Sequence, residues 1–178
     1  SATGFLYDCW SKLEGIAFST TGPSTPSSSY GGFGHSAISN GLQGSHVKVN
    51  IYGTSTKYWL VTPEIDLTNV SGSQLTFDLA LTDYANGDTI DVNSYTYDDK
   101  FMVIVSTDTG NTWLQQNATI WSDDTTINAN YSYRGIYNSG QQVTIDLSQY
   151  SGNIIKIAFY AESTVEGGDN DLQIDNIL

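Results

Sequence analysis

Apolar and polar residues alternate along several short segments of this chain. Residues 46–52 (HVKVNIY) alternate strictly, and residues 75–81 (LTFDLAL) place their leucines and phenylalanine on one face. This period of two is typical of half-buried antiparallel strands. Residues 101–105 (FMVIV) are instead apolar without interruption, which predicts a strand that is buried on both faces. Further strands are expected at residues 4–10, 57–67, 143–147, 154–162 and 172–178.

No segment has the apolar period of a helix, so the expected strands, about eight to ten, favour a β-sandwich. Their spacing is irregular and long loops separate them, chiefly at residues 82–99 and 122–142. That spacing favours a jelly roll of two antiparallel sheets over an up-and-down barrel. The sequence therefore predicts an all-β jelly-roll β-sandwich in which residues 1–178 form a single module, which we expect to be excised from a larger secreted protein.

A tight turn is predicted directly after the apolar run at 101–105. Ser106, Asp108, Gly110, Thr112 and Trp113 follow it in the spacing S-x-D-x-G-x-T-W. The aspartate can accept hydrogen bonds from the turn backbone, the glycine can take a positive φ, and the tryptophan can fold back over the turn. The pattern resembles the Asp-box, a hairpin motif of several β architectures of secreted proteins. We therefore interpret Asp108 as a turn-holding residue and not as a catalytic acid.

The net charge of the chain limits the classes of partner that it can bind. Six basic residues stand against 19 acidic residues, which gives a net charge of −13. Such a surface repels nucleic acid and anionic lipid and attracts divalent cations. No apolar stretch reaches the length of about 18 residues that a membrane span needs, so no membrane insertion is expected. Cys9 is the only cysteine, which excludes an internal disulfide, and we expect its thiol to be buried.

No catalytic constellation is visible in the sequence. His35 and His46 are the only histidines, and they do not have the H-x-x-x-H spacing of a zinc protease. No serine lies in a G-x-S-x-G elbow. The carboxylate pairs Asp98–Asp99 and Asp123–Asp124 are adjacent in sequence, and adjacent residues of a strand point to opposite faces. The sequence therefore predicts a protein that is not an enzyme.

Aromatic residues offer a means of binding. The chain has 12 tyrosines and four tryptophans, whose rings can stack on sugars or anchor a protein partner. The aromatic residues of the expected strands are assigned to the core. Tyr95 and Tyr97 share one face if their loop is extended, and so do Tyr131 and Tyr133 in theirs. These four loop tyrosines are our candidate ligand-binding residues.

Oxygen ligands for calcium are concentrated in one turn near the C-terminus. Glu166, Asp169 and Asp171 surround Gly167 and Gly168, which would let the backbone curl around an ion. Close carboxylates repel one another unless a cation neutralises them, so these three acids are candidate calcium ligands. The alternative is that they are solvated turn residues.

From about residue 57 to its end, the chain resembles the bacterial cleaved-adhesin modules. These are also called choice-of-anchor J domains and are related to the animal MAM domain. The resemblance is carried by segments in matching order and spacing, namely YWLVTPEIDL at 58–67, LTFD at 75–78, residues 99–113, TIDLSQYSG at 144–152, IAF at 157–159 and LQIDNI at 172–177.

The resemblance implies a jelly-roll sandwich that is secreted or displayed on a bacterial surface, often appended to a protease, glycosidase or adhesin. It also implies structural calcium held by acids near the N-terminus and by the acids of the terminal I-D-d-I motif. These map onto Asp8 and Asp175, whereas the second terminal acid is Asn176 here. The N-terminal family motif is only faintly echoed at residues 6–10.

Three functions are compatible with these observations. The first is a non-catalytic adhesion or ligand-binding module of a secreted or cell-surface bacterial protein, whose partner is an extracellular glycan or a host or surface protein. The second is a carbohydrate-binding module that targets an appended glycoside hydrolase. The third is a structural spacer between other domains of the parent chain.

Overall fold

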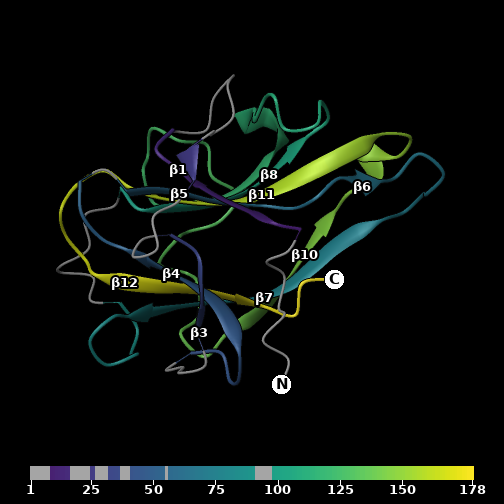
Figure 1. The fold of residues 1–178 in the computed structure, drawn as a ribbon. Coiled ribbons are helices and arrows are strands. Elements are labelled where there is room, and N and C mark those ends of the chain that lie inside the picture. The colour runs from purple at the N-terminus through teal and green to yellow at the C-terminus, as the bar shows by residue number, and fades with distance from the viewer. Residues whose placement is uncertain (1–8, 17–24, 27–31, 37–40, 55, 91–97) are drawn as a thin grey trace.

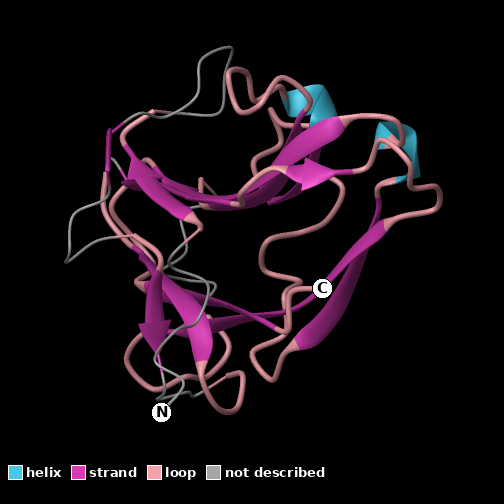
Figure 2. Ribbon diagram, turned by 45° about the vertical axis from the view of Figure 1, so that its right-hand side comes forward, coloured by secondary structure: helices cyan, strands magenta, loops and turns pink. Residues whose placement is uncertain are grey.

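Two antiparallel β-sheets pack face to face in this computed structural model (Figure 1). The structure describes residues 9–16, 25–26, 32–36, 41–54, 56–90 and 98–178. Figure 2 shows the two layers and the two short 3-10 helices at their margin, Gln115–Asn117 and Ser148–Tyr150. The predicted all-β jelly-roll sandwich is confirmed. In the described part of the chain, no helix has the length and apolar character needed to cross a membrane.

Within the described residues, the larger sheet has seven strands and the smaller sheet has five. The larger sheet runs in the order β2 (Thr25–Pro26), β1 (Ser11–Glu14), β5 (Thr56–Val61), β11 (Ile154–Ser163), β8 (Lys100–Ser106) and β9 (Ala118–Ser122), with β6 (Ile65–Asp66) also paired to β11. The smaller sheet runs in the order β10 (Gln141–Asp146), β7 (Gln74–Asp83), β12 (Asn170–Asp175), β4 (His46–Ile51) and β3 (Gly34–Ser36).

The core between the sheets is formed by the apolar faces that the alternation predicts. In β7 the side chains of Leu75, Phe77, Leu79 and Leu81 are all buried there. The ring of Phe77 meets that of Phe159 edge to face, with centroids 5.4 Å apart. Burial of such apolar area is the main favourable term in folding the sandwich.

Strand β8 is buried on both faces, as its uninterrupted apolar sequence predicts. Its odd-numbered residues face the core between the sheets, whereas Met102 and Ile104 belong to a second apolar cluster on the outer face of the larger sheet. Trp59 and Trp113 cover that outer face, and their ring centroids lie 5.7 Å apart. The second cluster is why a strand of a two-layered sandwich has no solvent-exposed side.

Asp108 holds the turn after β8, which confirms its predicted role. One of its oxygens accepts hydrogen bonds from the Ser106 hydroxyl at 2.7 Å and from the Thr112 backbone N–H at 3.0 Å. The other accepts a hydrogen bond from the Thr112 hydroxyl at 2.8 Å. Gly110 has a φ of 90°, as this turn requires, and Trp113 folds back until its side chain is buried.

The N-terminal expectations were partly wrong. The first described strand is β1, which begins at Ser11 and not within residues 4–10, of which 4–8 lie outside the described residues. Cys9 lies in the turn before β1 and is exposed, because a turn position directs its side chain toward neither sheet. In residues 57–67 the ladder ends before Pro63, as the proline predicts, and the two parts are β5 and β6.

Two connections that are far apart in sequence, the one between β7 and β8 and the turn between β11 and β12, meet at one end of the sandwich. The Tyr84 backbone N–H donates to the Asp169 carbonyl at 3.1 Å. The Val165 backbone N–H donates to the carboxylate of Asp98 at 2.7 Å. Both described ends of the β7–β8 connection are therefore joined to the turn between β11 and β12, and the loop after β9 reaches that turn through a buried hydrogen bond described below.

Candidate ligand-binding site

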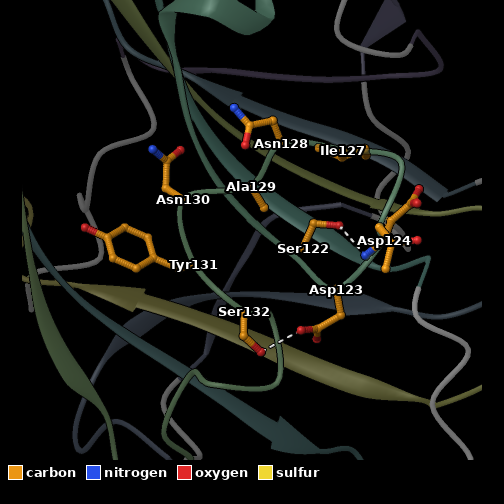
Figure 3. A pocket seen from close by; sticks show the side chains of 10 residues that line it. Ser122, Asp123, Asp124, Ile127, Asn128, Ala129, Asn130, Tyr131 and Ser132 are labelled. Atoms are coloured by element: carbon orange, nitrogen blue, oxygen red, sulfur yellow. Dashed lines mark hydrogen bonds between the residues drawn. The ribbon is translucent and has the colours of Figure 1, made fainter.

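An open hollow lies at this end of the sandwich, beside the end of β9. Its volume is about 370 Å³. Strand β9 and the segment that returns along it supply the walls, which Figure 3 shows from close by. The lining residues are Ser122, Asp123, Asp124, Thr125, Ile127, Asn128, Ala129, Asn130, Tyr131 and Ser132.

The returning segment is fastened to the outer edge of β9. The backbone N–H groups of Asn130 and Tyr131 both donate to the Ile120 carbonyl, at 2.9 and 3.0 Å. The Ile120 N–H in turn donates to the side-chain oxygen of Asn130 at 2.9 Å, and the Ser122 N–H donates to the Tyr131 carbonyl at 3.0 Å. These bonds satisfy the backbone of an edge strand and give the hollow a fixed wall.

Tyr131 stands at one edge of the hollow, with Asp123 and Asp124 at the other (Figure 3). Its side chain is 54% exposed. The ring stacks on the buried indole of Trp121, with centroids 5.1 Å apart and planes inclined by 27°. The stack fixes the tyrosine ring in place while most of its surface stays open to solvent.

The prediction that Tyr133 shares this exposed face is wrong. Tyr133 is fully buried, and its hydroxyl donates to the side-chain oxygen of Asn170 at 2.6 Å. The extended backbone that would place the two rings on one face is absent, because the chain turns at residues 132–136, where the Ile136 N–H donates to the Tyr133 carbonyl at 3.1 Å. Tyr95 and Tyr97 lie outside the described residues, so their role stays a prediction.

Both carboxylates of the hollow also hold its loop. Asp123 accepts hydrogen bonds from the Ser132 hydroxyl at 2.6 Å and the Arg134 backbone N–H at 3.0 Å, and it forms an ion pair with the Arg134 guanidinium at 3.2 Å. Asp124 accepts from the hydroxyl and the backbone N–H of Thr126, at 2.7 and 2.9 Å. These hydrogen bonds from Thr126 lower the pKa of Asp124, because they favour its charged form.

A buried polar network fastens the loop of the hollow to the rest of the fold. Tyr133 bonds Asn170 at the start of β12, and the Asn170 amide donates to the carboxyl of Asp99 at 2.9 Å. Asp99 is fully buried. Burial raises its pKa to about 7, although hydrogen bonds from Asn170 and Ser163 act in the opposite direction.

The acids predicted to bind calcium in the turn before β12 are bonded to side chains of other residues. Within the described ranges, no group of three acidic, histidine or cysteine side chains is placed to hold a metal ion. The three acids are not gathered around one point. Polar groups on β4 and just beyond it bond them instead, and the Asn50 amide donates to both Asp169 and Asp171. Glu166 accepts from the Tyr52 hydroxyl at 3.0 Å, Asp169 from the Asn50 amide at 2.7 Å, and Asp171 from the Lys48 ammonium at 2.7 Å.

Asp175 lies at the other end of β12, so the structure does not bring it to the three turn acids. It stands opposite Asp78 of β7 in the register of the smaller sheet, and the neighbouring Asn176 amide donates to the Asp78 carboxylate at 2.7 Å. Its expected partner, Asp8, lies outside the described residues. A calcium ion held by Asp8 and Asp175 therefore stays a prediction.

Sequence reasoning chose Tyr131 but missed most of the hollow around it. In the sequence, Asp123 and Asp124 stand out only as an adjacent carboxylate pair, and nothing marks Asn128 and Asn130. The signal present in the sequence is a strand that ends in W-S-D-D and is followed by the short polar return TTINANY. Such a return places polar side chains beside the strand end when it folds back along the strand.

No family model matches this chain, and no curated protein matches it. Solved structures match it at low identity. The K1 cleaved adhesin domain of Lys-gingipain from Porphyromonas gingivalis W83 is 18% identical with a TM-score of 0.52, over 94% of this chain and 88% of that domain. A carbohydrate-binding module of family 61, solved with β-1,4-galactotriose, is 14% identical with a TM-score of 0.52, over 94% of this chain and 85% of that module. This chain therefore has the β-sandwich fold that these adhesin and carbohydrate-binding domains share.

Proposed function

We propose that this chain is a non-catalytic binding module of a secreted or cell-surface protein, of the adhesion type, and that it binds a glycan in the hollow beside β9. The observation that carries the proposal is the exposed ring of Tyr131, held in place by Trp121 at the edge of a polar hollow. The similarity in fold to adhesin and carbohydrate-binding domains supports it.

The arrangement suits a sugar because a pyranose has both apolar and polar surfaces. Its C–H face packs on an aromatic ring, and its hydroxyls need hydrogen-bond partners around the rim. Tyr131 supplies the ring, while Asp124, Asn128 and Asn130 supply polar groups in the hollow. Because Trp121 already fixes the tyrosine, little side-chain entropy is lost when a ligand binds.

The same geometry argues against catalysis by the carboxylates. A general acid needs a pKa near the working pH, but the pKa of Asp124 is lowered by its bonds to Thr126. Asp123 is engaged by Arg134 in an ion pair. Asp99 has a pKa near neutrality but is fully buried, so no substrate reaches it.

Glycan binding is tested with the isolated domain on a glycan array, followed by titration calorimetry with the glycan that binds best. Tyr131→Ala should weaken binding by about tenfold or more, since an aromatic anchor of this kind contributes roughly 1.5 kcal/mol or more. Tyr137→Ala is the matched control, because Tyr137 is 64% exposed and does not line the hollow. Absence of binding to any glycan by the wild-type domain would reject the proposal, and so would equal loss in the two variants.

A carbohydrate-binding module that targets an appended glycoside hydrolase is the second candidate. The fold similarity to the family 61 module favours it. The two candidates differ in their ligand, since targeting requires binding to a structural polysaccharide and adhesion requires binding to glycans of a cell surface. Pull-down on insoluble polysaccharides beside binding to intact cells separates them.

A further inference from the structure

We infer that the hollow selects neutral sugars and rejects sugars that carry a carboxylate or a sulfate. This inference rests on the proposed function, because it names the class of glycan that the same site accepts. It follows from the charge of the lining, from the hydrogen-bonding groups that the lining offers and from the size of the hollow.

The lining carries negative charge and offers no cation that could pair with an anionic ligand. Asp123 and Asp124 line the hollow, and none of its lining residues is Lys, Arg or His. Two cations flank it, and both are already paired. Arg134 forms an ion pair with Asp123 at 3.2 Å, and Lys100, which stands opposite Ser122 across β8 and β9, is buried with its ammonium 3.3 Å from Glu162.

An anionic sugar would therefore meet a carboxylate with no counter-charge available. The chain as a whole adds to the repulsion, since its net charge is −13. The repulsion between like charges a few ångströms apart weakens binding about fivefold even in a water-like medium, and by more where water is excluded. Repulsion of this size is large enough to decide between two otherwise identical glycans.

The polar groups of the hollow suit hydroxyls. Carboxylates accept hydrogen bonds and donate none, so the ligand must supply donors, which sugar hydroxyls do. Asn130 offers the complementary group, because its side-chain oxygen accepts from the Ile120 N–H and this leaves the amide NH₂ to donate to a ligand. Each sugar hydroxyl can thus both donate and accept, whereas a carboxylate or sulfate only accepts.

The size of the hollow limits how much of the glycan is recognised. A volume of about 370 Å³ is near the lower end of the range for ligand pockets, which is roughly 300–1,000 Å³. Tyr131 is the one aromatic ring in the lining. The hollow therefore suits a short segment of sugar that is stacked on a single ring, and one acidic group on that segment is enough to weaken binding.

The test uses matched pairs on the array, namely lactose and N-acetyllactosamine, each unmodified and each carrying a terminal sialic acid or a sulfate, among a wider set of neutral and acidic glycans. The wild-type domain should prefer unmodified glycans over their acidic counterparts by about tenfold or more. Asp124→Asn should reduce this ratio at least about threefold, because the neutral amide keeps the acceptor for Thr126 but removes the charge.

Asp146→Asn is the matched control. Asp146 also caps a turn, accepting from the Ser148 backbone N–H at 2.8 Å, but it is at the end of β10 in the other sheet. Its replacement removes the same charge and should leave the ratio unchanged. An equal effect of the two variants would overturn the assignment of selectivity to the hollow. If acidic glycans bind as strongly as neutral glycans, and this binding depends on Tyr131, the inference is overturned while the proposed function stands. If no glycan binds, both are overturned.

Discussion

Replacing Asp99 by asparagine tests the buried network behind the hollow. Asp99 is fully buried at the start of β8, and burial raises its pKa from the usual 3.8 to about 7. The native state therefore holds a proton that the unfolded chain has already released. Below about pH 4 the carboxyl is neutral in both states, so its burial does not lower the free energy of unfolding. Above pH 7 it is charged in both states, and the native state bears the cost of a buried charge.

The sign and the size of the effect follow from this difference. Because the native state binds more protons than the unfolded state, the free energy of unfolding falls as pH rises through the folded pKa. Each pH unit between 3.8 and about 7 lowers the free energy of unfolding by about 1.4 kcal/mol, so Asp99 lowers it by roughly 4 kcal/mol in all. Between pH 5 and pH 8 it is about 2–3 kcal/mol.

Asp99→Asn keeps an oxygen that accepts from the Asn170 amide but cannot ionise. Urea unfolding, followed by the fluorescence of the buried tryptophans, gives the free energy of unfolding of both proteins at pH 5, 6.5 and 8. We expect the difference, variant minus wild type, to rise by about 2–3 kcal/mol from pH 5 to pH 8. Taking the difference removes the pH dependence that comes from the other acidic residues.

Glu64→Gln serves as the control, since Glu64 is exposed between β5 and β6. Its difference from wild type should stay within about 0.5 kcal/mol across the same range. A difference for Asp99→Asn that is equally flat would refute the reasoning, because it would mean that Asp99 does not carry a proton in the native state near neutral pH.

Three further predictions concern stability. Asp108→Ala should lower the free energy of unfolding by about 1–3 kcal/mol, because the turn loses its side-chain acceptor, and Asp108→Asn should lower it by less. A melting temperature of Asp108→Ala equal to that of wild type would contradict this prediction. Lys100→Met should lower the free energy of unfolding by about 3–5 kcal/mol, because it leaves the buried Glu162 without a cation. Adding Glu162→Gln to this variant should restore at least half of that loss. Equal free energies of unfolding for the single and double variants, measured with urea, would contradict this prediction. Calcium should raise the melting temperature above that in chelator, by mass action on the native state. Coincident melting curves, together with no ion in metal analysis, would remove the calcium prediction.

The strands and the turn after β8 follow from the sequence because their causes are local. Alternation with a period of two predicts β4 and β7 within a few residues of their ends, and the uninterrupted apolar run predicts the two-sided burial of β8. The hydrogen bonds of Asp108 reach residues no more than four positions away. A pattern of neighbouring residues contains the information needed for structure of this kind.

Tyr131 and Tyr133 show where local reasoning fails. Their spacing predicts one shared face only while the backbone is extended, and the turn at 132–136 removes that condition. Which of the two rings is exposed is then decided by their partners. Tyr131 stacks on Trp121 of the edge strand, whereas Tyr133 bonds Asn170, which is 37 residues away in sequence.

The sequence by itself determined strands β4, β7, β8, β10, β11 and β12, the sandwich and the turn held by Asp108, because backbone conformation and the apolar face of a strand depend on adjacent residues. Only the tertiary structure decided which polar groups meet. Lys48 pairs with Asp171 across 123 residues and Tyr52 bonds Glu166 across 114, so that acids expected to gather around an ion are bonded to other side chains. Contacts of this kind depend on the order of the strands and on the packing of the two sheets. A local pattern of side chains does not predict either of them.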